Sequence, residues 1–511
     1  MTKILQIEVC TSWRVDTSSC LMGFGMLSLI ELRICFVCIC DPLFFDKAAF
    51  KLLYMSFSIS LIKQHLSYYI CAIRRPGLGV KLLGGAVSRD AGFISNLAMR
   101  RASRAVELMR CLPHLRDPQC ELLLLRSCMG VGKLLFGLRT CQPMYVGEAV
   151  SVFDNGLREA IEDIVVCGGP FFGDLQWRLA SLPTRFGGFG LCSAEDVSTY
   201  AFVASRAQSW ALQDHILRSC GLDGLDSDYG IGQSLEVRFD LSPRQKAVVA
   251  CLQAPRAQDF LTVIPIEGLG QHMSPLEYRA ILKYRLMIPL FPVDEPCPVC
   301  RKVCLDAFGD HAVHCKELPG FKYRHDLVRD VLCDILKRAG ISAKKEAPVN
   351  FLTDPLEGRS TLRPADILVF GWTGGKHACV DLTGVSPLVA LRDNGFVARQ
   401  AASKAESCKI AKHEKACLEN QHVFIPLAFD TFGFLATEAV NFLTRVQRVI
   451  HSNVSTPKGQ GFVFSRLGFA IQKGAATLKE QLQREGELKK VLEAGINKNL
   501  TLSYILYSFQ Y

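Results

Sequence analysis

Two short stretches in the last third of the chain decide the fold: RPADILVF at positions 363–370 and ACVDLT at positions 378–383. Both are apolar runs of strand length, and the Gly-Gly pair at 374–375 between them is a turn signal. The sequence therefore predicts two strands joined by a tight turn. Each strand carries one aspartate, Asp366 or Asp381. The two carboxylates are expected on adjacent strands.

The flanking sequence extends these strands into a small α/β domain, expected at residues 319–455. Two further strands are expected at Ile341–Val349 and Val423–Phe429. Helices are expected at Tyr323–Arg338, Arg399–Leu418 and Glu438–Val449. Such alternation of helices and strands is typical of an α/β fold.

The aspartate pair suggests a chemistry. Two carboxylates on adjacent strands can share a divalent cation, and Mg²⁺ prefers oxygen ligands while keeping several waters. A bound Mg²⁺ or Mn²⁺ makes a coordinated water molecule a stronger nucleophile and stabilises the negative charge that develops at a phosphate. This is the chemistry of phosphodiester hydrolysis. Glu346, on the preceding strand, is a candidate further ligand or water-orienting residue.

A lysine is expected near such a site, but the position two residues after the second aspartate holds Thr383. The following helix offers substitutes. At 100° per residue, four of its lysines fall within an arc of about 140°, which makes one basic face. They are Lys404, Lys409, Lys412 and Lys415. An ordinary solvated lysine face is the competing interpretation.

A cysteine and histidine cluster precedes this domain, at residues 291–318. Cys297 and Cys300 form a C-x2-C pair, and after ten residues His311 and Cys315 form an H-x3-C pair. These spacings allow the four side chains to meet at a tetrahedral Zn²⁺, and four filled positions favour a structural role. A segment this short folds around its metal.

Other ligand sets remain open within this cluster. Cys304 and His314 are surplus candidates, and His314 replaces His311 if the helical turn is rotated. A chance grouping in a chain with 22 cysteines is the competing interpretation. These cysteines are scattered, and no convincing secretory leader precedes them, so reduced thiols in an intracellular protein are expected.

The composition limits the number of domains, the charge of the partners and the chance of a membrane span. A chain of 511 residues with 49% hydrophobic and 21% charged residues predicts a globular protein of two to four domains. The net charge of +10 is a mild bias towards anionic partners. The apolar stretch Cys20–Phe45 is interrupted by Glu31, Arg33 and Asp41, so it supplies no clean membrane span. No membrane attachment is expected.

Three further segments complete the expected layout of a multidomain α+β protein. Residues 1–73 are an apolar, cysteine-rich extension without an assigned role. Residues 74–290 are expected to form a mainly helical region, broken at prolines and containing a linker at Gly221–Gly232. Residues 456–511 are expected to be a basic helical tail, peripheral to the rest.

These ordered motifs resemble those of early-branching non-LTR (LINE-type) retrotransposons, whose polyproteins end in a restriction-like endonuclease of the PD-(D/E)XK superfamily. The resemblance runs from about Gly77 to Gly433. Its C-terminal part lies in the four zinc ligands, Arg324-His325, the 363–366 and 381–387 motifs, Lys409-x-x-Lys412-His413 and Phe424–Gly433. Upstream, Gly79–Gly84 is similar to the segment that follows the palm of a reverse transcriptase, and Leu182–Ala194 is similar to its thumb and connecting region.

The resemblance implies roles for individual residues. Asp366 and Asp381 are expected to bind the catalytic metal, and Lys409 or Lys412, displaced onto the helix, to complete the site. It also implies DNA as substrate, RNA as a further partner and a nuclear location. One departure is that Pro-Ala-Asp stands where the superfamily has Pro-Asp.

The polymerase is missing from this polypeptide. Reverse transcriptases hold their metals with adjacent aspartates, and the chain has no two adjacent aspartates. A working reverse transcriptase is therefore excluded, and a DNA-nicking domain is the leading hypothesis. The alternative is a non-catalytic nucleic-acid-binding protein or a functionless relic of the polyprotein.

Overall fold

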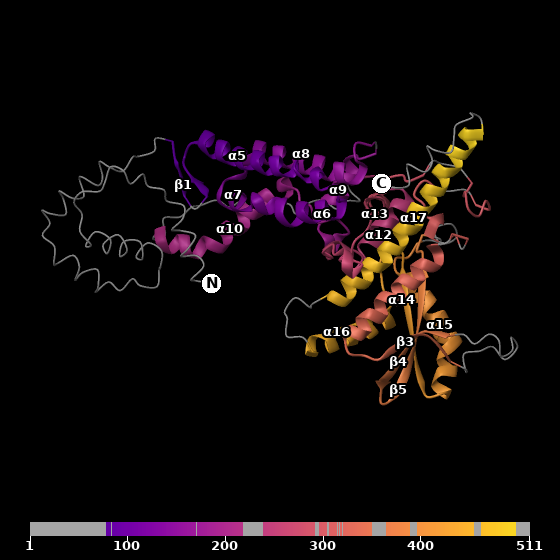
Figure 1. Cartoon of the computed structure of the whole chain (residues 1–511). Coiled ribbons are helices and arrows are strands. Elements are labelled where there is room, and N and C mark those ends of the chain that lie inside the picture. Colours follow the sequence, from indigo (N-terminus) through magenta and orange to yellow (C-terminus); the bar gives the residue numbers. More distant parts are fainter. Residues whose placement is uncertain are drawn as a thin grey trace, which may run out of the picture. The chain divides into compact units, whose positions relative to one another are not determined.

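The computed structural model describes residues 78–82, 84–169, 171–217, 239–291, 296–303, 306–313, 315, 317–318, 320–349, 364–388, 396–453 and 461–496. These residues belong to one compact unit, Leu78–Tyr511. The extension at 1–73 and the linker at Gly221–Gly232 lie outside the described residues. The fold is mixed α/β and mostly helical (Figure 1), as the sequence predicts at this level.

The first part of this unit is helical. It contains a two-stranded hairpin, β1 (Val80–Leu82) and β2 (Gly85–Val87), followed by α5 (Ala91–Met109), α6 (Pro118–Leu124), α7 (Leu135–Thr140), α8 (Pro143–Val166), α9 (Asp174–Ser181), α10 (Ala194–Leu217), α12 (Pro243–Leu252) and α13 (Pro275–Arg285). Pro118, Pro143, Pro243 and Pro275 each begin a helix, where proline has no hydrogen bond to lose.

The long helices α5 and α8 pack side by side (Figure 1). Phe153 and Leu157 of α8 are fully buried, and Ala102 and Ala105 of α5 lie in the same apolar core. A Cβ added to Gly156 would lie 2.5 Å from Cγ2 of Val106. Only glycine therefore allows the two helices to approach this closely.

The C-terminal part is built on a four-stranded sheet. Its elements are α14 (Gly320–Arg338), β3 (Ala343–Pro348), β4 (Pro364–Thr373), β5 (Lys376–Val385), α15 (Gln400–Glu419), β6 (His422–Asp430), α16 (Thr437–Asn453) and α17 (Phe462–Ile496). The strand order is β3-β4-β5-β6, in which β5 and β6 run parallel and the other pairs antiparallel. Every strand and helix expected here is present, with bounds shifted by a few residues.

Helices cover both faces of this sheet. One face packs against α14, α16 and α17, and its buried residues include Ile367, Val369, Val380, Leu382, Ile425 and Leu427. On the other face, Cys379 and Phe424 pack against Cys417 of α15. Because side chains alternate along a strand, Asp381, two residues after Cys379, lies on the α15 face. Asp381 therefore lies between the sheet and α15.

Helix α17 corrects one expectation. The tail was expected to be peripheral, but α17 contributes to three separate cores. Leu467 and Ile471 lie in the core of the sheet domain, Phe469 in that of the helical region, and Leu478 in the cluster around the cysteines. The expectation is wrong because apolar residues occur on several faces of this helix, where a peripheral helix has one apolar stripe.

No helix in the described part of the chain is both long and apolar enough to cross a membrane.

Candidate metal centres

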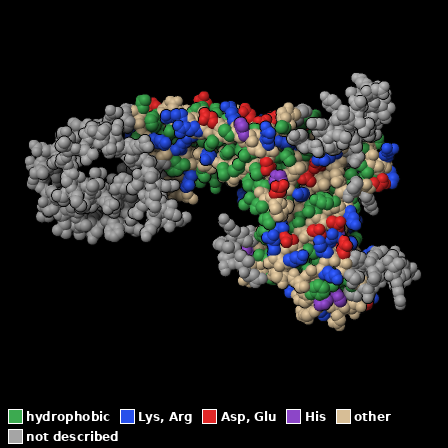
Figure 2. Space-filling model, in the orientation of Figure 1, with side chains coloured by type: hydrophobic (Ala, Val, Ile, Leu, Met, Phe, Trp, Pro, Cys, Tyr) green, Lys and Arg blue, Asp and Glu red, His purple; other side chains and the backbone are tan. Residues whose placement is uncertain are grey.

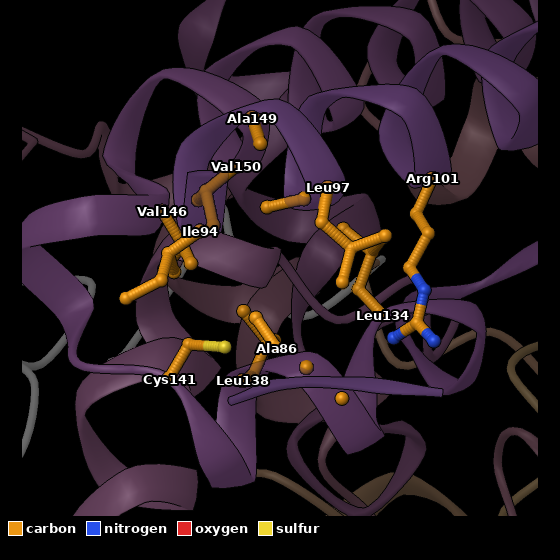
Figure 3. A pocket seen from close by; sticks show the side chains of 13 residues that line it. Ala86, Ile94, Leu97, Arg101, Leu134, Leu138, Cys141, Val146, Ala149 and Val150 are labelled. Carbon is orange, nitrogen blue, oxygen red and sulfur yellow. The ribbon is translucent and has the colours of Figure 1, made fainter. Parts of the chain in front are cut away.

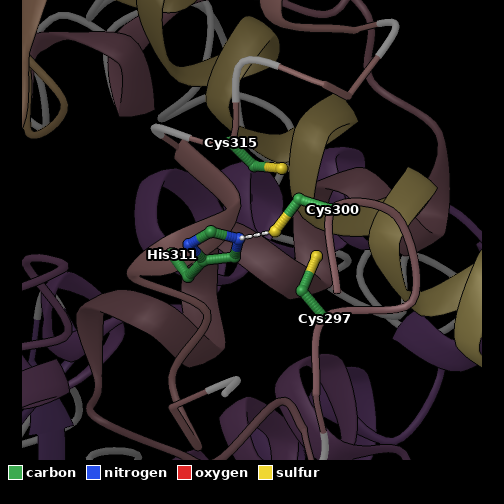
Figure 4. Close-up of side chains that lie close together, drawn as sticks. All are labelled: Cys297, Cys300, His311 and Cys315. Carbon is green, nitrogen blue, oxygen red and sulfur yellow. Dashed lines mark hydrogen bonds between the residues drawn. The ribbon is translucent and has the colours of Figure 1, made fainter. Parts of the chain in front are cut away.

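The four residues singled out by spacing meet in space. One ligand atom from each of Cys297, Cys300, His311 and Cys315 lies within 4.8 Å of the others (Figure 4). Nε2 of His311 faces the cluster and lies 3.4 Å from Sγ of Cys300. Among the described residues this is the one group of three or more such ligands. It can hold a metal such as zinc. Cys304 and His314, the alternative ligands, lie outside the described residues.

Local hydrogen bonds bring the two halves of this cluster together. The backbone N–H of Cys297 donates to the carbonyl of Val303 at 2.9 Å, which closes the first turn. The Asp306 carboxylate accepts from the backbone N–H groups of Asp310 and His311, both at 2.9 Å. Cys315 then donates to the carbonyl of His311 at 3.0 Å, which places both ligands on one turn.

The pKa values of His311 and Cys300 favour metal binding, whereas burial raises the pKa of Cys315 to about 11, so this thiol has to lose its proton as the metal binds. Burial lowers the pKa of His311, which favours the neutral imidazole that binds metals. Burial opposes ionisation of Cys300, but hydrogen bonds from the backbone of Lys302 and from neighbouring thiols lower the pKa of this thiol overall. Cys297 and Cys315 are almost fully buried. Three sulfurs and one neutral nitrogen are the donor set of structural zinc sites.

The cluster is not an isolated knuckle, because three helices hold it. Arg244 of α12 contacts both carboxylate oxygens of Asp310 at 3.1 Å, and the Tyr284 hydroxyl of α13 donates to Asp310 at 2.9 Å. Lys479 of α17 is fully buried and donates to the carbonyls of Phe308 and Gly309 at 3.1 and 2.8 Å. The loop that carries His311 is thereby fixed to the helical region.

The two aspartates lie on adjacent strands, as expected. Ile367 of β4 pairs with Val380 of β5, and continuing this antiparallel register places Asp366 opposite Asp381. Side chains at directly opposite positions point to the same face of a sheet. The carboxylate of Asp381 contacts α15 through Lys409, and the charge of Lys409 also helps to lower the pKa of Asp366.

Asp366 is held by two donors. Its Oδ2 accepts the backbone N–H of Leu382 at 2.7 Å and lies 3.3 Å from Nε2 of His325. Burial by itself would raise the pKa of Asp366. The hydrogen bonds from His325 and Leu382 outweigh that effect, so the pKa is lowered overall. The carboxylate stays ionised, as a metal ligand must.

Of the two candidate lysines, Lys409 reaches Asp381. Its Nζ lies 2.8 Å from Oδ2 of Asp381. The residues Ala402, Glu406 and Cys417 are buried on α15, and Lys409 lies on the same stripe at helical spacing. Lys412 lies off that stripe and faces solvent, as do Lys404 and Lys415. The structure therefore separates two lysines that the sequence left equivalent.

Glu346 lies on β3 but in a different environment. In the β3–β4 register it stands opposite Asp366, between the paired positions Lys345 and Ala347. Its backbone has a φ of 46°, a left-handed conformation unusual for glutamate. Its carboxylate pairs with the guanidinium of Arg329. The contacts of Glu346 are therefore those of an ion-pair partner of Arg329, and its role as a metal ligand stays a prediction.

His325 is the residue that sequence reasoning missed as part of this site. It appears there as half of the Arg324-His325 pair, with no role. On α14 its Nε2 faces Asp366 and its Nδ1 lies 3.5 Å from the Asp326 carboxylate. The hydrogen bond to Asp366 is the main cause of a raised pKa at His325. No spacing rule links positions 325 and 366.

Neither known protein families nor curated proteins gave a match to the chain.

Proposed function

We propose that the chain is a metal-dependent DNA endonuclease derived from the C-terminal part of a non-LTR retrotransposon polyprotein. The observation that carries the proposal is the placement of Asp366 opposite Asp381, with the Lys409 ammonium 2.8 Å from Asp381. Two carboxylates on adjacent strands and one nearby cation are groups that metal-dependent hydrolysis of a phosphodiester requires. DNA is the proposed substrate, RNA a further partner, and the nucleus the location that a DNA substrate implies.

The residues fit a hydrated divalent cation. Apart from the ion pair with Lys409, Oδ2 of Asp381 is buried without a hydrogen bond, as are the hydroxyls of Thr383 and Ser386. Buried polar atoms ordinarily have partners, and waters around Mg²⁺ would provide them. Asp366 and Asp381 supply two oxygens, which suits an ion that keeps several waters.

Each side chain then has a defined task. Asp366 and Asp381 hold Mg²⁺ or Mn²⁺, which when bound supplies an activated water and stabilises the charge on the phosphate. Lys409 stabilises the negative charge that develops on the phosphoryl oxygens as water attacks. His325 orients Asp366 through its contact with Oδ2. The zinc cluster has all four positions filled by side chains and is proposed as structural.

A second candidate function is nucleic-acid binding without cleavage. It is favoured by one observation: Glu346, which stands opposite Asp366 in register, is bound by Arg329. The carboxylate on β3 that could serve as a third acidic ligand is thus already paired with Arg329. Under this alternative the site is a remnant whose fold persists without activity.

Nicking of supercoiled plasmid by the full chain separates the two candidates. Cleavage is expected with Mg²⁺ or Mn²⁺, and Asp381→Asn should lower it by orders of magnitude because a charged metal ligand is removed. Asp174→Asn, an exposed aspartate of the helical region, is the matched control. Absence of nicking by a folded, zinc-loaded chain would leave the binding function. Nicking that is equal in Asp381→Asn would refute the site.

A further inference from the structure

A basic hollow lies on the helical region, on residues that the proposed nuclease does not use. It is formed by α5, the short turn Val131–Lys133 and α7, and it has a volume of about 370 Å³ open to solvent. Six residues line it: Arg101, Arg104, Ala105, Leu108, Lys133 and Phe136. Three of these six side chains are cationic, namely those of Arg101, Arg104 and Lys133. We define these six residues as the basic hollow.

The cations of the basic hollow lack acidic partners. No ion pair joins Arg101, Arg104 or Lys133 to a carboxylate within the part of the chain that the structure describes. The guanidinium of Arg101 donates to the carbonyl of Gly84, which fixes its position. Helix α5 carries a single acidic residue, Glu107, against three arginines. Unpaired cations around one hollow favour a polyanion.

Apolar side chains are exposed beside these cations. Leu108 is 46% exposed and Phe136 is 45% exposed. Figure 2 shows Lys and Arg side chains interspersed with hydrophobic and acidic ones over the region of α5 and α8. An exposed aromatic ring next to cations offers a stacking surface for an unpaired base, while the cations contact the backbone phosphates. Duplex DNA keeps its bases stacked inside and cannot use the Phe136 ring in this way.

A neighbouring gap does not compete as a binding site. Arg101 also borders an apolar space that includes Ile94, Leu97, Leu138 and Val150 (Figure 3). Its free volume is about 20 Å³, which holds about one water molecule. No organic ligand fits there, so a ligand that contacts Arg101 has to approach from the basic hollow.

We propose that the basic hollow binds single-stranded nucleic acid, with phosphates on Arg104, Lys133 and Arg101 and a base stacked on Phe136. The inference goes beyond the proposed nuclease, because none of these residues belongs to the metal centres. It gives the chain a second nucleic-acid contact that operates whether or not cleavage occurs.

Binding is tested by fluorescence anisotropy on the full chain in an Asp381→Asn background, without added divalent cation. The probes are a labelled single-stranded DNA, a single-stranded RNA of the same sequence and the corresponding DNA duplex. Tight binding of either single strand supports the proposal, and the preferred strand identifies the ligand. The proposal is overturned if neither the single-stranded DNA nor the single-stranded RNA binds. It is also overturned if substitutions in the basic hollow weaken binding of the duplex as much as binding of the single strands.

The variants separate phosphate contact from stacking. Arg104→Ala and Lys133→Ala should each weaken single-strand binding and lower the slope of log K against log salt by about 0.7. Phe136→Ala should weaken single-strand binding at least about fivefold and leave duplex binding unchanged. Arg110→Ala, an exposed arginine at the end of α5 and outside the hollow, is the control. If the three variants match Arg110→Ala while keeping zinc and helix content, the proposal is wrong.

Discussion

The ammonium of Lys409 lies 2.8 Å from the Oδ2 atom of Asp381, and this contact joins helix α15 to strand β5. Lys412, one turn further along the same helix, faces solvent. The two lysines share a motif, but their surroundings differ. This difference gives the proposed chemistry a matched pair of variants.

Lys409→Ala should lower plasmid nicking by about 100-fold or more, because a cation that stabilises transition-state charge is lost. Lys412→Ala should stay within about threefold of the unmodified chain, since the change removes only a solvated surface charge. Initial rates at saturating Mg²⁺ measure both. A larger loss in Lys412→Ala than in Lys409→Ala would contradict the assignment.

The zinc cluster predicts a metal content of about one zinc per chain. Cys300→Ser should abolish zinc binding and lower the thermal midpoint, because the binding free energy of a structural metal contributes to folding. Metal analysis and thermal unfolding measure the two effects. Cys111→Ser, at an exposed free cysteine, should change neither. Full zinc retention in Cys300→Ser would mean that another residue is the ligand.

Lys479 predicts a pH dependence of stability. Burial lowers its pKa from 10.5 to about 8. Between these values the unfolded chain binds more protons at this lysine than the folded chain, so stability rises with pH. The free energy of unfolding of the unmodified chain, relative to Lys479→Met, should therefore increase from pH 8 to pH 10, by roughly 1.4 kcal/mol per pH unit at most. Chemical denaturation at several pH values tests this. A relative stability that stays flat or falls over this range would show that the folded protein retains the proton on Lys479.

The purified chain should not extend any primer on a template. The prediction follows from the absence of two adjacent aspartates, which a reverse transcriptase needs to hold its metals. A primer-extension assay with Mg²⁺ and with Mn²⁺ tests it, with a known polymerase as positive control. Template-dependent extension would overturn it.

Local signals explain what the sequence predicts well. The strands carrying Asp366 and Asp381 are apolar runs bounded by turn residues, and such runs define strands without knowledge of the partner strand. The four residues of the cysteine and histidine cluster lie on two tight turns with fixed spacing, so the sequence alone predicts that Cys297, Cys300, His311 and Cys315 meet. In both cases the determining interactions lie within about twenty residues.

Long-range contacts explain the rest. His325 meets Asp366 only because α14 packs against the end of β4, and no local pattern encodes that contact. The choice of Lys409 depends on which stripe of α15 is buried against Cys379 and Phe424. The positions of Lys409 and Lys412 on the basic face of an isolated helix are similar, and only tertiary packing distinguishes them.

Helix α17 has a consequence for how this coding sequence tolerates genetic change. A nonsense or frameshift mutation just after Asn453 would leave both candidate metal centres encoded, yet it would remove Val463, Phe464, Leu467 and Ile471 from the core of the sheet domain. It would also remove Lys479, which fixes the loop carrying His311. Selection for either centre therefore acts on codons far downstream of the last ligand. An open reading frame that continues through the codon of Lys479 in related genes would therefore indicate selection for at least one of the two candidate centres.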